Sequence, residues 1–302
     1  MKIVINWHIT EACNYECFYC FAKWQKKNQK ELLHSKEKVR KLMHEISLLP
    51  AILNVKNGTA FTGIRLNLVG GETFLYKQQV LNIIQEARKH GFELSAITNG
   101  SSLDQDLITV IATQFSTIGF SIDSLSDKSN LEIGRSFKNT PVEKDRILKY
   151  INEIRLISPN IDIKINSVIN QINKDEDLTD FIKKVSPSKW KVFKMLPVIT
   201  NQHMIDDFEF YNFLKKHDEL QHIISSEDND EMTHSYLMID PIGRFFQNSS
   251  TSCGYEYSSE IVTIGISNAL EEIVFNVNKF LKRSKLIPNL NVLNQTPYAE
   301  MA

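Results

Sequence analysis

The sequence predicts an α/β protein in which a parallel β-sheet, open or curved into a barrel, carries helices on its outer side. Strand-like and helix-like segments alternate along the first 197 residues of the 302-residue chain. The strand candidates also alternate polar and apolar side chains, as strands do when their two faces meet different surroundings. No internal repeat or low-complexity tract interrupts this pattern.

Six segments have the length and composition of β-strands. They are residues 2–10, 64–69, 92–98, 117–122, 162–168 and 191–195. Apolar residues at helical spacing predict helices between them, among others at residues 36–49, 78–89 and 143–157. Residues 23–37 are strongly polar, which predicts a solvated loop leading into the first helix. This βα repeat indicates parallel strands joined by helical crossovers.

The rhythm ends after about Pro197, so we expect a core at residues 1–197 and a C-terminal extension at residues 198–302 that closes the site. A polar, helix-rich stretch runs to Glu231. Residues 235–239 and 244–247 then predict a short hairpin, and the tail is less readable.

The composition is that of an ordinary globular protein, with 42% hydrophobic residues, 24% charged residues and a formal net charge of -1. A broad electrostatic attraction to nucleic acid or membrane is therefore not expected. The first ten residues alternate apolar and polar side chains, and no later run approaches about 18 apolar residues. We expect a cytoplasmic protein.

Five of the strands carry polar residues on one face and apolar residues on the other. The polar members are Asn6, His8, Thr10, Arg65, Asn67, Ser121, Asp123, Lys164, Asn166, Lys189 and Lys191. If the apolar faces pack on the helices, these polar, largely cationic faces converge inside a curved sheet, unlike a packed apolar barrel interior. The alternative is a half-exposed antiparallel sheet. Agreement among five strands of a βα repeat favours the curved parallel sheet.

Three of the four cysteines, Cys13, Cys17 and Cys20, lie within eight positions directly after the first strand. This distribution does not suit a disulfide framework and suits a metal site in a reducing compartment. Loops at the carboxyl ends of parallel strands are where α/β enzymes hold their chemistry. Three thiolates can ligate three irons of a [4Fe–4S] cubane and leave the fourth iron open for a reactant.

Two other interpretations of the cysteines stay open at this point. A structural zinc site needs four ligands, so Cys253 or a histidine such as His8 or His34 would have to complete it. A thiol redox pair formed by the last two cysteines would leave the first without a role. Cys253 has no companion cysteines, and we expect it to be a plain side chain.

The cysteine spacing resembles the signature of the radical S-adenosylmethionine (SAM) superfamily, which has an aromatic residue before the last cysteine, here Tyr19. Gly70-Gly71-Glu72 resembles the GGE element associated with the methionine amino group of SAM, with Thr73 where proline is common. Thr98-Asn99-Gly100 resembles another SAM-contacting region. The resemblance implies a partial (β/α)6 TIM barrel that holds two cofactors, a [4Fe–4S] cluster and SAM.

Longer stretches resemble the viperin family within this superfamily, in order and at intact spacing up to about Asn248. The stretches are residues 6–8, 133–135, 164–170, 189–193 and 235–240. Cys13 comes too early to leave room for the amphipathic membrane-binding extension of animal viperins. The resemblance therefore leads us to expect a soluble, prokaryotic-type member.

The viperin family converts a nucleoside triphosphate into its 3′-deoxy-3′,4′-didehydro analogue (ddhNTP), which terminates viral RNA synthesis. The resemblance implies a ddhNTP synthase, a lyase of the dehydratase type that serves antiviral or antiphage defence. Its expected partners are CTP, UTP, GTP or ATP and a reductant such as flavodoxin or ferredoxin, with no direct contact to nucleic acid and no membrane. The cationic strand faces suit a triphosphate independently of the resemblance.

The resemblance also implies roles for single residues. The implied substrate-binding set is Asn6, Arg65, Asn67, Lys164, Lys189 and Lys191. Arg65 replaces a lysine of animal members, and Val69 occupies the position of a serine. Ser121 and Arg135 keep the family's spacing for contacts to the SAM carboxylate, and Asn166 is expected between cofactor and substrate.

In the implied chemistry, the reduced cluster passes one electron to SAM, and the resulting 5′-deoxyadenosyl radical abstracts the C4′ hydrogen of the ribose. The 3′ hydroxyl then leaves as water, with one further electron and a proton. Tyr236 resembles the family tyrosine near the ribose and is the candidate hydrogen or proton donor. Its alternative is an aromatic residue that packs at the core edge. His8 is similarly ambiguous, because a strand histidine facing a polar interior can serve only to orient neighbours.

Two other functions are weighed against this one. Peptide-modifying radical SAM enzymes commonly add auxiliary clusters through several C-terminal cysteines, and here only Cys253 is available. Such an enzyme would also leave the cationic strand residues unexplained. A non-catalytic nucleotide sensor would have no need to keep an oxygen-sensitive cluster.

Overall fold

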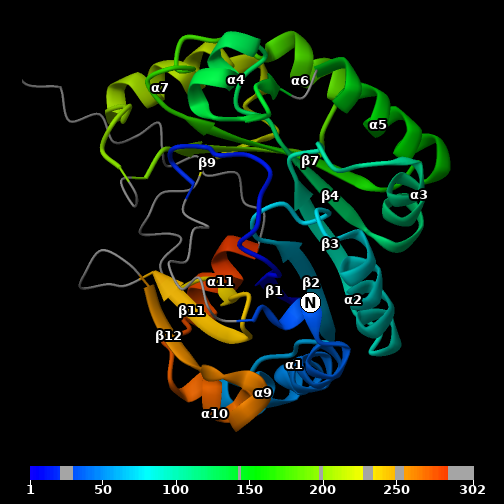
Figure 1. Cartoon of the computed structure of the whole chain (residues 1–302). Coiled ribbons are helices and arrows are strands. Elements are labelled where there is room, and N and C mark those ends of the chain that lie inside the picture. Colours follow the sequence, from blue (N-terminus) through cyan, green and yellow to red (C-terminus); the bar gives the residue numbers. More distant parts are fainter. Residues whose placement is uncertain (21–29, 142–143, 197–199, 227–233, 249–254, 285–302) are drawn as a thin grey trace, which may run out of the picture.

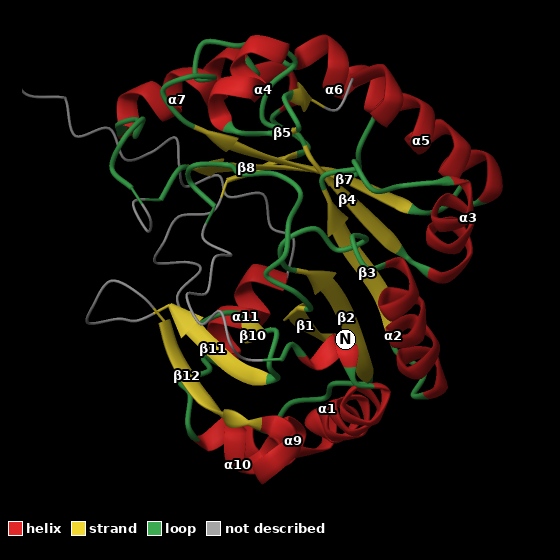
Figure 2. Ribbon diagram, in the orientation of Figure 1, coloured by secondary structure: helices red, strands yellow, loops and turns green. Residues whose placement is uncertain are grey.

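The computed structural model describes residues 1–20, 30–141, 144–196, 200–226, 234–248 and 255–284. Its centre is a curved sheet, and the helices α1, α2, α3, α5 and α6 lie along the outer side of the curve (Figure 1). Figure 2 shows the same alternation of strand and helix along the arc. The predicted α/β class with a parallel sheet is confirmed.

All six predicted strands are present. They are β1 (Lys2–His8), β2 (Gly63–Val69), β3 (Glu93–Thr98), β4 (Thr117–Ser121), β7 (Asp162–Ile169) and β8 (Lys189–Lys194). Each pairs in parallel with the next in this order, so their carboxyl ends meet along one edge. This parallel half-barrel brings the loops that follow the strands together.

Segments beyond residue 197 extend the sheet at both ends. On one side β9 (Ile224–Ser226), a strand that the sequence pattern missed, pairs in parallel with β8. On the other side β10 (Leu237–Ile239) pairs in parallel with β1, and β11 (Arg244–Asn248) and β12 (Tyr255–Glu260) follow antiparallel. The predicted hairpin is therefore confirmed in β10 and β11. A separate two-stranded ladder joins β5 (Ser136–Phe137) and β6 (Thr140–Pro141).

The helices fill the crossovers and the C-terminal part. The α-helices are α1 (Lys36–Asn57), α2 (Lys77–Lys89), α3 (Gln105–Gln114), α4 (Asp127–Ile133), α5 (Lys144–Ile157), α6 (Thr179–Val185), α7 (Asp207–Lys216), α9 (Ile261–Ile264), α10 (Ile266–Glu271) and α11 (Val277–Ser284). Two single 3₁₀ turns are η1 (Leu32–His34) and η2 (Asp218–Leu220). Among the described helices, none has both the length and the apolar composition needed to cross a bilayer.

The first helix and the segment before it each differ from the sequence expectation. It starts at the predicted residue, where the Ser35 side chain accepts a hydrogen bond from Lys38 N at 3.3 Å, but it continues through Pro50 for two further turns. Pro50 removes one helical hydrogen bond, while Leu53 in the next turn is buried and offsets that loss. The solvated loop predicted at residues 23–37 is wrong at its end, because Leu32 and Leu33 are buried in η1. Residues 23–29 lie outside the described ranges.

The two faces of the strands are separated as predicted. Trp7 on β1 and Trp190 on β8 are completely buried against the helices, whereas Asn6, Lys189 and Lys191, their neighbours along the strands, are only half-buried. Burying these indoles and the aliphatic residues around them supplies the hydrophobic stabilisation of the sheet. The polar inner face is left for a ligand.

Candidate active site

The cysteine loop, residues 13–20, leaves the carboxyl end of β1 and is fixed to a second loop. Glu16 N donates to Gly134 O at 3.0 Å, and Phe18 N donates to Ile133 O at 3.1 Å. Gly134 has a φ of 86°, and a Cβ atom there would lie 2.5 Å from Glu16 O. Only glycine allows this approach. The Ile-Gly-Arg stretch singled out in the sequence therefore forms one wall of the cysteine loop.

Gly70 and Gly71 hold the base of the same loop. Gly71 N donates to Thr10 O at 2.7 Å, and a Cβ atom on Gly71 would lie 2.2 Å from Ala12 O. A Cβ atom on Gly70, whose φ is 134°, would lie 2.5 Å from Thr10 O. The two glycines are needed for close packing against the segment that leads into Cys13.

The Glu72 side chain joins the loops that follow β2 and β3. Its carboxylate accepts hydrogen bonds from Thr98 Oγ1 at 2.5 Å, Asn99 N at 2.8 Å and Phe74 N at 3.2 Å. Glu72 is fully buried and Thr98 nearly so, and burial raises the pKa of the Glu72 carboxyl. These two predicted cofactor residues therefore connect the loops that follow β2 and β3.

Asn99 connects Glu72 to the cysteines. Its Nδ2 atom lies 3.2 Å from Asn14 Oδ1 and 3.8 Å from Cys13 Sγ, and Asn14 donates in turn to Ser101 Oγ at 2.7 Å. The three motif regions, predicted separately along the chain, thus meet around Cys13.

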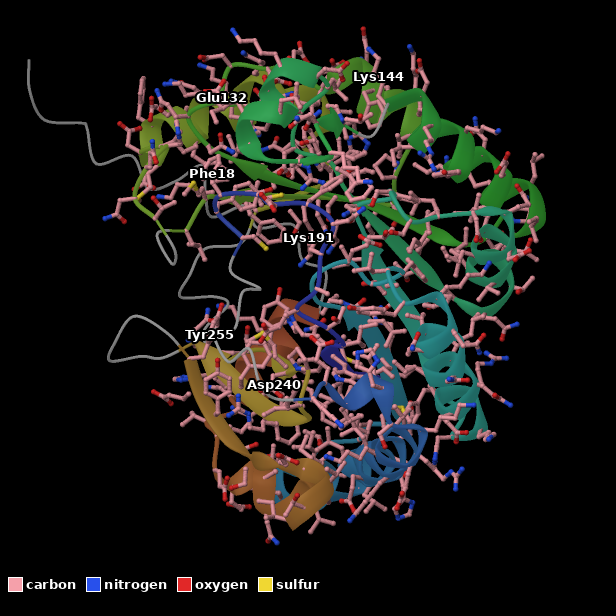
Figure 3. All side chains as sticks on the ribbon, viewed as in Figure 1. Phe18, Glu132, Lys144, Lys191, Asp240 and Tyr255 are labelled. Atoms are coloured by element: carbon pink, nitrogen blue, oxygen red, sulfur yellow. The ribbon has the colours of Figure 1, made fainter. Side chains whose placement is uncertain are left out.

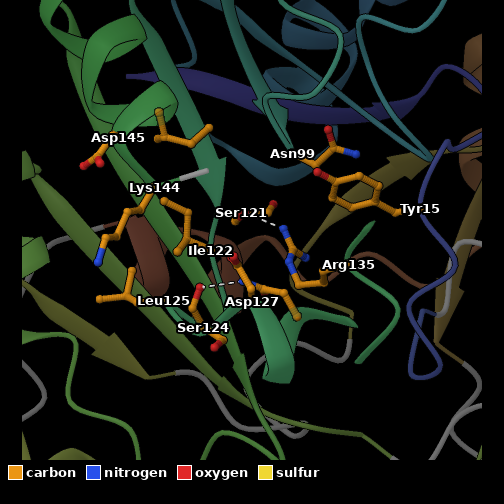
Figure 4. A pocket seen from close by; sticks show the side chains of 12 residues that line it. Tyr15, Asn99, Ser121, Ile122, Ser124, Leu125, Asp127, Arg135, Lys144 and Asp145 are labelled. Carbon is orange, nitrogen blue, oxygen red and sulfur yellow. Dashed lines mark hydrogen bonds between the residues drawn. The ribbon is translucent and has the colours of Figure 1, made fainter. Parts of the chain in front are cut away.

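A pocket of about 390 Å³ opens beside this junction (Figure 4). Asn99, Ser121 and Arg135, three of the predicted cofactor residues, line it. Tyr15 of the cysteine loop lines it as well, and the sequence interpretation did not assign that residue a role. The radical SAM signature singles out Tyr19, before the last cysteine, and gives no signal for Tyr15 in the same loop.

Arg135 is the centre of a buried polar network. Its guanidinium lies 3.2 Å from the Asp123 carboxylate and donates to Ser121 O. The Tyr19 hydroxyl donates to the same carboxylate, and Asp123 Oδ1 accepts from Val168 N at 2.9 Å. Asp123 therefore ties the cysteine loop to β7. The sequence interpretation recorded Asp123 as a polar face residue and missed its role in holding Arg135 and Tyr19.

The cationic residues gather on the inner face of the sheet. Lys164 is opposite Lys189 in the strand register, and Asn166 is opposite both Ser121 and Lys191. Burial and the positive charges of Arg65, Lys189 and Lys191 lower the pKa of Lys164 to about 8. Neither Arg65 nor Lys164 forms an ion pair with a described residue. Arg65 Nε is buried and has no hydrogen-bond partner in the described part of the chain.

Asn6 and Asn67 are neighbours on β1 and β2. Ser95 Oγ donates to Asn67 Oδ1 at 2.9 Å, and Asn67 Nδ2 donates to Asn6 Oδ1 at 2.7 Å. His8 lies further along β1, where burial lowers its pKa to about 3, so it stays neutral. The positive charge of the inner face therefore comes from arginine and lysine.

Tyr236 approaches the cationic group from the other end of the sheet. Its hydroxyl lies 3.4 Å from Lys191 Nζ, and its main-chain oxygen accepts from Gln247 Nε2 at 2.6 Å. Figure 3 shows Lys191 on the inner side of the sheet, facing the hairpin of β11 and β12. The structure thus brings Tyr236 together with the predicted substrate residues.

The three cysteine thiols are the groups that would hold an iron–sulfur cubane. Burial raises the pKa of Cys17 to about 12, so at neutral pH its thiolate needs a metal in place of the proton. Within the described ranges, no three His, Cys, Asp or Glu side chains converge as the ligands of one ion would. The zinc interpretation finds no support there, whereas a cubane binds each thiolate on a different iron. Cys253 lies outside the described ranges.

A model of the radical SAM superfamily matches residues 7–185. The fold and the three-cysteine loop thus define a radical SAM protein. Among solved structures, native anSMEcpe with bound AdoMet has a TM-score of 0.67 at 13% identity, covering 93% of this chain and 82% of that one. Streptococcus suis SuiB bound to precursor peptide SuiA has a TM-score of 0.62 at 12% identity, covering 94% and 67%. At these identities the likeness concerns the fold.

Curated relatives give the narrower class. The chain is 51% identical to the S-adenosylmethionine-dependent nucleotide dehydratase of Psychrobacter lutiphocae, covering 94% of this chain and 95% of that one. It is 38% identical to the protein of the same name from Fibrobacter sp., covering 93% and 87%. Identity to the dehydratase RSAD2 of Oncorhynchus mykiss is 27%, covering 92% and 78%. The chain belongs to the viperin family of S-adenosylmethionine-dependent nucleotide dehydratases.

Proposed function

We propose that this protein converts a nucleoside triphosphate into the 3′-deoxy-3′,4′-didehydro nucleotide by a SAM-dependent dehydration. The observation that carries the proposal is the group of four cations on the inner sheet face, next to the pocket lined by Asn99, Ser121 and Arg135. A peptide substrate gives no reason for this concentration of positive charge.

The triphosphate would be bound by Arg65, Lys164, Lys189 and Lys191. These four cations lie on β2, β7 and β8. Burial and then the positive charges of the other three lower the pKa of Lys164, and a polyanion would relieve that repulsion. The buried Arg65 Nε would gain the acceptor that the described protein does not provide. Asn6 and Asn67 would add neutral hydrogen bonds beside these charges.

The cofactors would be held by Cys13, Cys17 and Cys20 and by the pocket residues. When bound, the cluster and SAM supply one-electron reduction and a carbon-centred radical that abstracts hydrogen. Asn166 is opposite Ser121 of the pocket and Lys191 of the cationic group, so it would separate cofactor from substrate and orient the ribose. Tyr15 and the Asp123–Arg135 pair close the pocket on the side of the cysteine loop.

Overall, the substrate would lose the C4′ hydrogen and then the 3′ hydroxyl as water, with one electron and one proton supplied. Tyr236 is our candidate donor, because its hydroxyl lies 3.4 Å from Lys191 Nζ, which keeps it beside the phosphate site. We further propose that residues 198–302, which carry Tyr236, close the substrate site of a core at residues 1–197, and that a flavodoxin or ferredoxin is the reductant.

The test is an anaerobic reaction of the reconstituted protein with dithionite, SAM and CTP, UTP, GTP or ATP, each alone, analysed by mass spectrometry. We expect one or more triphosphates to yield a product lighter by one water, in step with release of 5′-deoxyadenosine. SAM cleavage that no triphosphate stimulates, with no dehydrated product, would rule the proposal out.

A further inference from the structure

The cysteine loop contains two tyrosines whose hydroxyl groups have different surroundings. The Tyr19 hydroxyl donates to the Asp123 carboxylate and lies 3.4 Å from Arg135 Nη1. The Tyr15 hydroxyl is buried and has no hydrogen-bond partner among the described residues. Two phenol hydroxyls four residues apart in one loop therefore differ, because the described protein gives a hydrogen-bond partner to one and not to the other.

An unsatisfied buried hydroxyl destabilises a folded protein, and native structures rarely keep one without a reason. Tyr15 is 5% exposed, so bulk water does not satisfy it in place of the protein. A molecule that fits against the Tyr15 side chain would supply the partner that the described residues do not.

The pocket provides the place for such a molecule. Tyr15 lines it together with Asn99, Ser121 and Arg135, and the hydroxyl end of the Tyr15 ring points toward Asn99 in Figure 4. The Arg135 guanidinium carbon lies 5.8 Å from the centre of the Tyr15 ring. A ligand that contacts Arg135 is therefore also within reach of the Tyr15 side chain.

We propose that the Tyr15 hydroxyl is a cofactor-binding group that donates a hydrogen bond to the methionine carboxylate of SAM. The charge of the pocket supports the carboxylate as acceptor. The Asp123 carboxylate already neutralises much of the Arg135 charge, so an anion bound there needs neutral donors in addition. A neutral phenol is such a donor. The inference rests on the proposed function, which makes SAM the ligand of this pocket.

The test compares Tyr15→Phe with Tyr19→Phe, which each remove one hydroxyl from the same loop. Without SAM, the Tyr15→Phe protein melts at the wild-type temperature or higher, because it loses an unsatisfied group. Tyr19→Phe melts lower, because it removes a hydrogen bond to a buried carboxylate. SAM affinity of the cluster-loaded protein, measured by anaerobic calorimetry, falls about tenfold in Tyr15→Phe and by less in Tyr19→Phe. An equal loss of melting temperature in both variants, or an unchanged SAM affinity in Tyr15→Phe, overturns the inference.

Two ligand fragments test the carboxylate itself. S-adenosylhomocysteine keeps the amino-acid group, so Tyr15→Phe lowers the affinity for S-adenosylhomocysteine by about the same factor as the affinity for SAM. Methylthioadenosine lacks that group, so the wild type and Tyr15→Phe bind it equally. Weaker binding of methylthioadenosine to Tyr15→Phe overturns the carboxylate assignment. The proposed function fails separately, if the wild type binds SAM in this pattern yet dehydrates no triphosphate.

Discussion

The two halves of the site satisfy their polar groups in different ways. On the cofactor side the buried polar groups are paired within the protein: Asp123 pairs with Arg135, and Glu72 accepts hydrogen bonds from Thr98 and Asn99. On the substrate side, Arg65 and Lys164 form no ion pair with any residue in the described ranges, and four like charges share one sheet face. The first half is therefore organised before its ligand binds, whereas we propose that Arg65 and Lys164 of the second gain their counter-charge from the ligand.

This difference predicts that mutations on the cofactor side disturb assembly, whereas mutations on the substrate side change affinity. The largest effect is expected at Cys17. Cys17→Ala removes the most buried of the three thiols, so we expect iron content to fall and SAM cleavage to be abolished. Formation of 5′-deoxyadenosine, measured by liquid chromatography, should be undetectable. A variant that still made it would contradict the assignment of the cluster ligands.

Gly71→Ala tests whether the glycine is needed for packing of the cysteine loop. The added Cβ atom would lie 2.2 Å from Ala12 O, so the loop must shift, at a cost of about 1–3 kcal/mol of unfolding free energy. We expect a lower melting temperature and reduced iron incorporation. The control is Gly63→Ala in β2, where the nearest atom would be 3.9 Å away. Equal melting temperatures and iron contents in the two variants would mean that the close approach at Gly71 does not contribute to stability.

Lys191→Ala tests the substrate half. Loss of a charge-assisted contact of about 1.5–3 kcal/mol should weaken triphosphate binding by roughly ten- to a hundredfold. Iron content and SAM affinity should stay at wild-type values, since the lysine belongs to the other half. Lys194→Ala is the matched control, because that lysine lies on the same strand and pairs with Asp207 at the exposed side. Unchanged nucleotide affinity in Lys191→Ala would remove it from the phosphate site.

The pH dependence of binding sharpens the same contrast. The pKa of Lys164 is lowered from 10.5 to about 8, so the free protein loses this positive charge as pH rises through about 8. Triphosphate affinity should then decline above pH 8, by at most about tenfold per pH unit. Lys164→Arg stays charged and should flatten this decline. A decline of equal slope in both proteins would assign it to another group.

The stability of the nucleotide-free protein should depend on pH in the opposite direction from triphosphate affinity. Between pH 8 and 10.5 the unfolded chain binds a proton at Lys164 that the folded chain does not. The contribution of Lys164 to the free energy of unfolding therefore rises with pH across this window. Chemical denaturation of the wild type and Lys164→Arg at several pH values isolates that contribution.

Strand periodicity made much of the fold and the substrate half predictable. Because side chains alternate along a strand, the positions of Lys164 and Lys189 already fix which face they occupy. A helix that connects two successive strands returns the chain to the starting end of the sheet, so the two strands run parallel. The predicted end of α1 at residue 49 is wrong. Pro50 normally ends a helix, and only the burial of Leu53 in the next turn shows why this helix continues.

The cofactor half was predictable as motifs but not as a network. The roles of Asp123 and Tyr15 depend on how loops from β1, β4 and the Ile-Gly-Arg stretch fold against each other, and no periodicity encodes that. Glu72 is an example, because its motif predicts a cofactor-binding residue but does not predict that its carboxylate also accepts hydrogen bonds from Thr98 and Asn99.

The proposed reaction requires a nucleotide held so that its ribose faces the SAM pocket. The most direct measurement uses a triphosphate deuterated at C4′ in the anaerobic reaction and determines the mass of the 5′-deoxyadenosine formed. We predict one deuterium transferred into that molecule, together with a dehydrated nucleotide. Unlabelled 5′-deoxyadenosine alongside an intact triphosphate would contradict the placement of substrate beside cofactor.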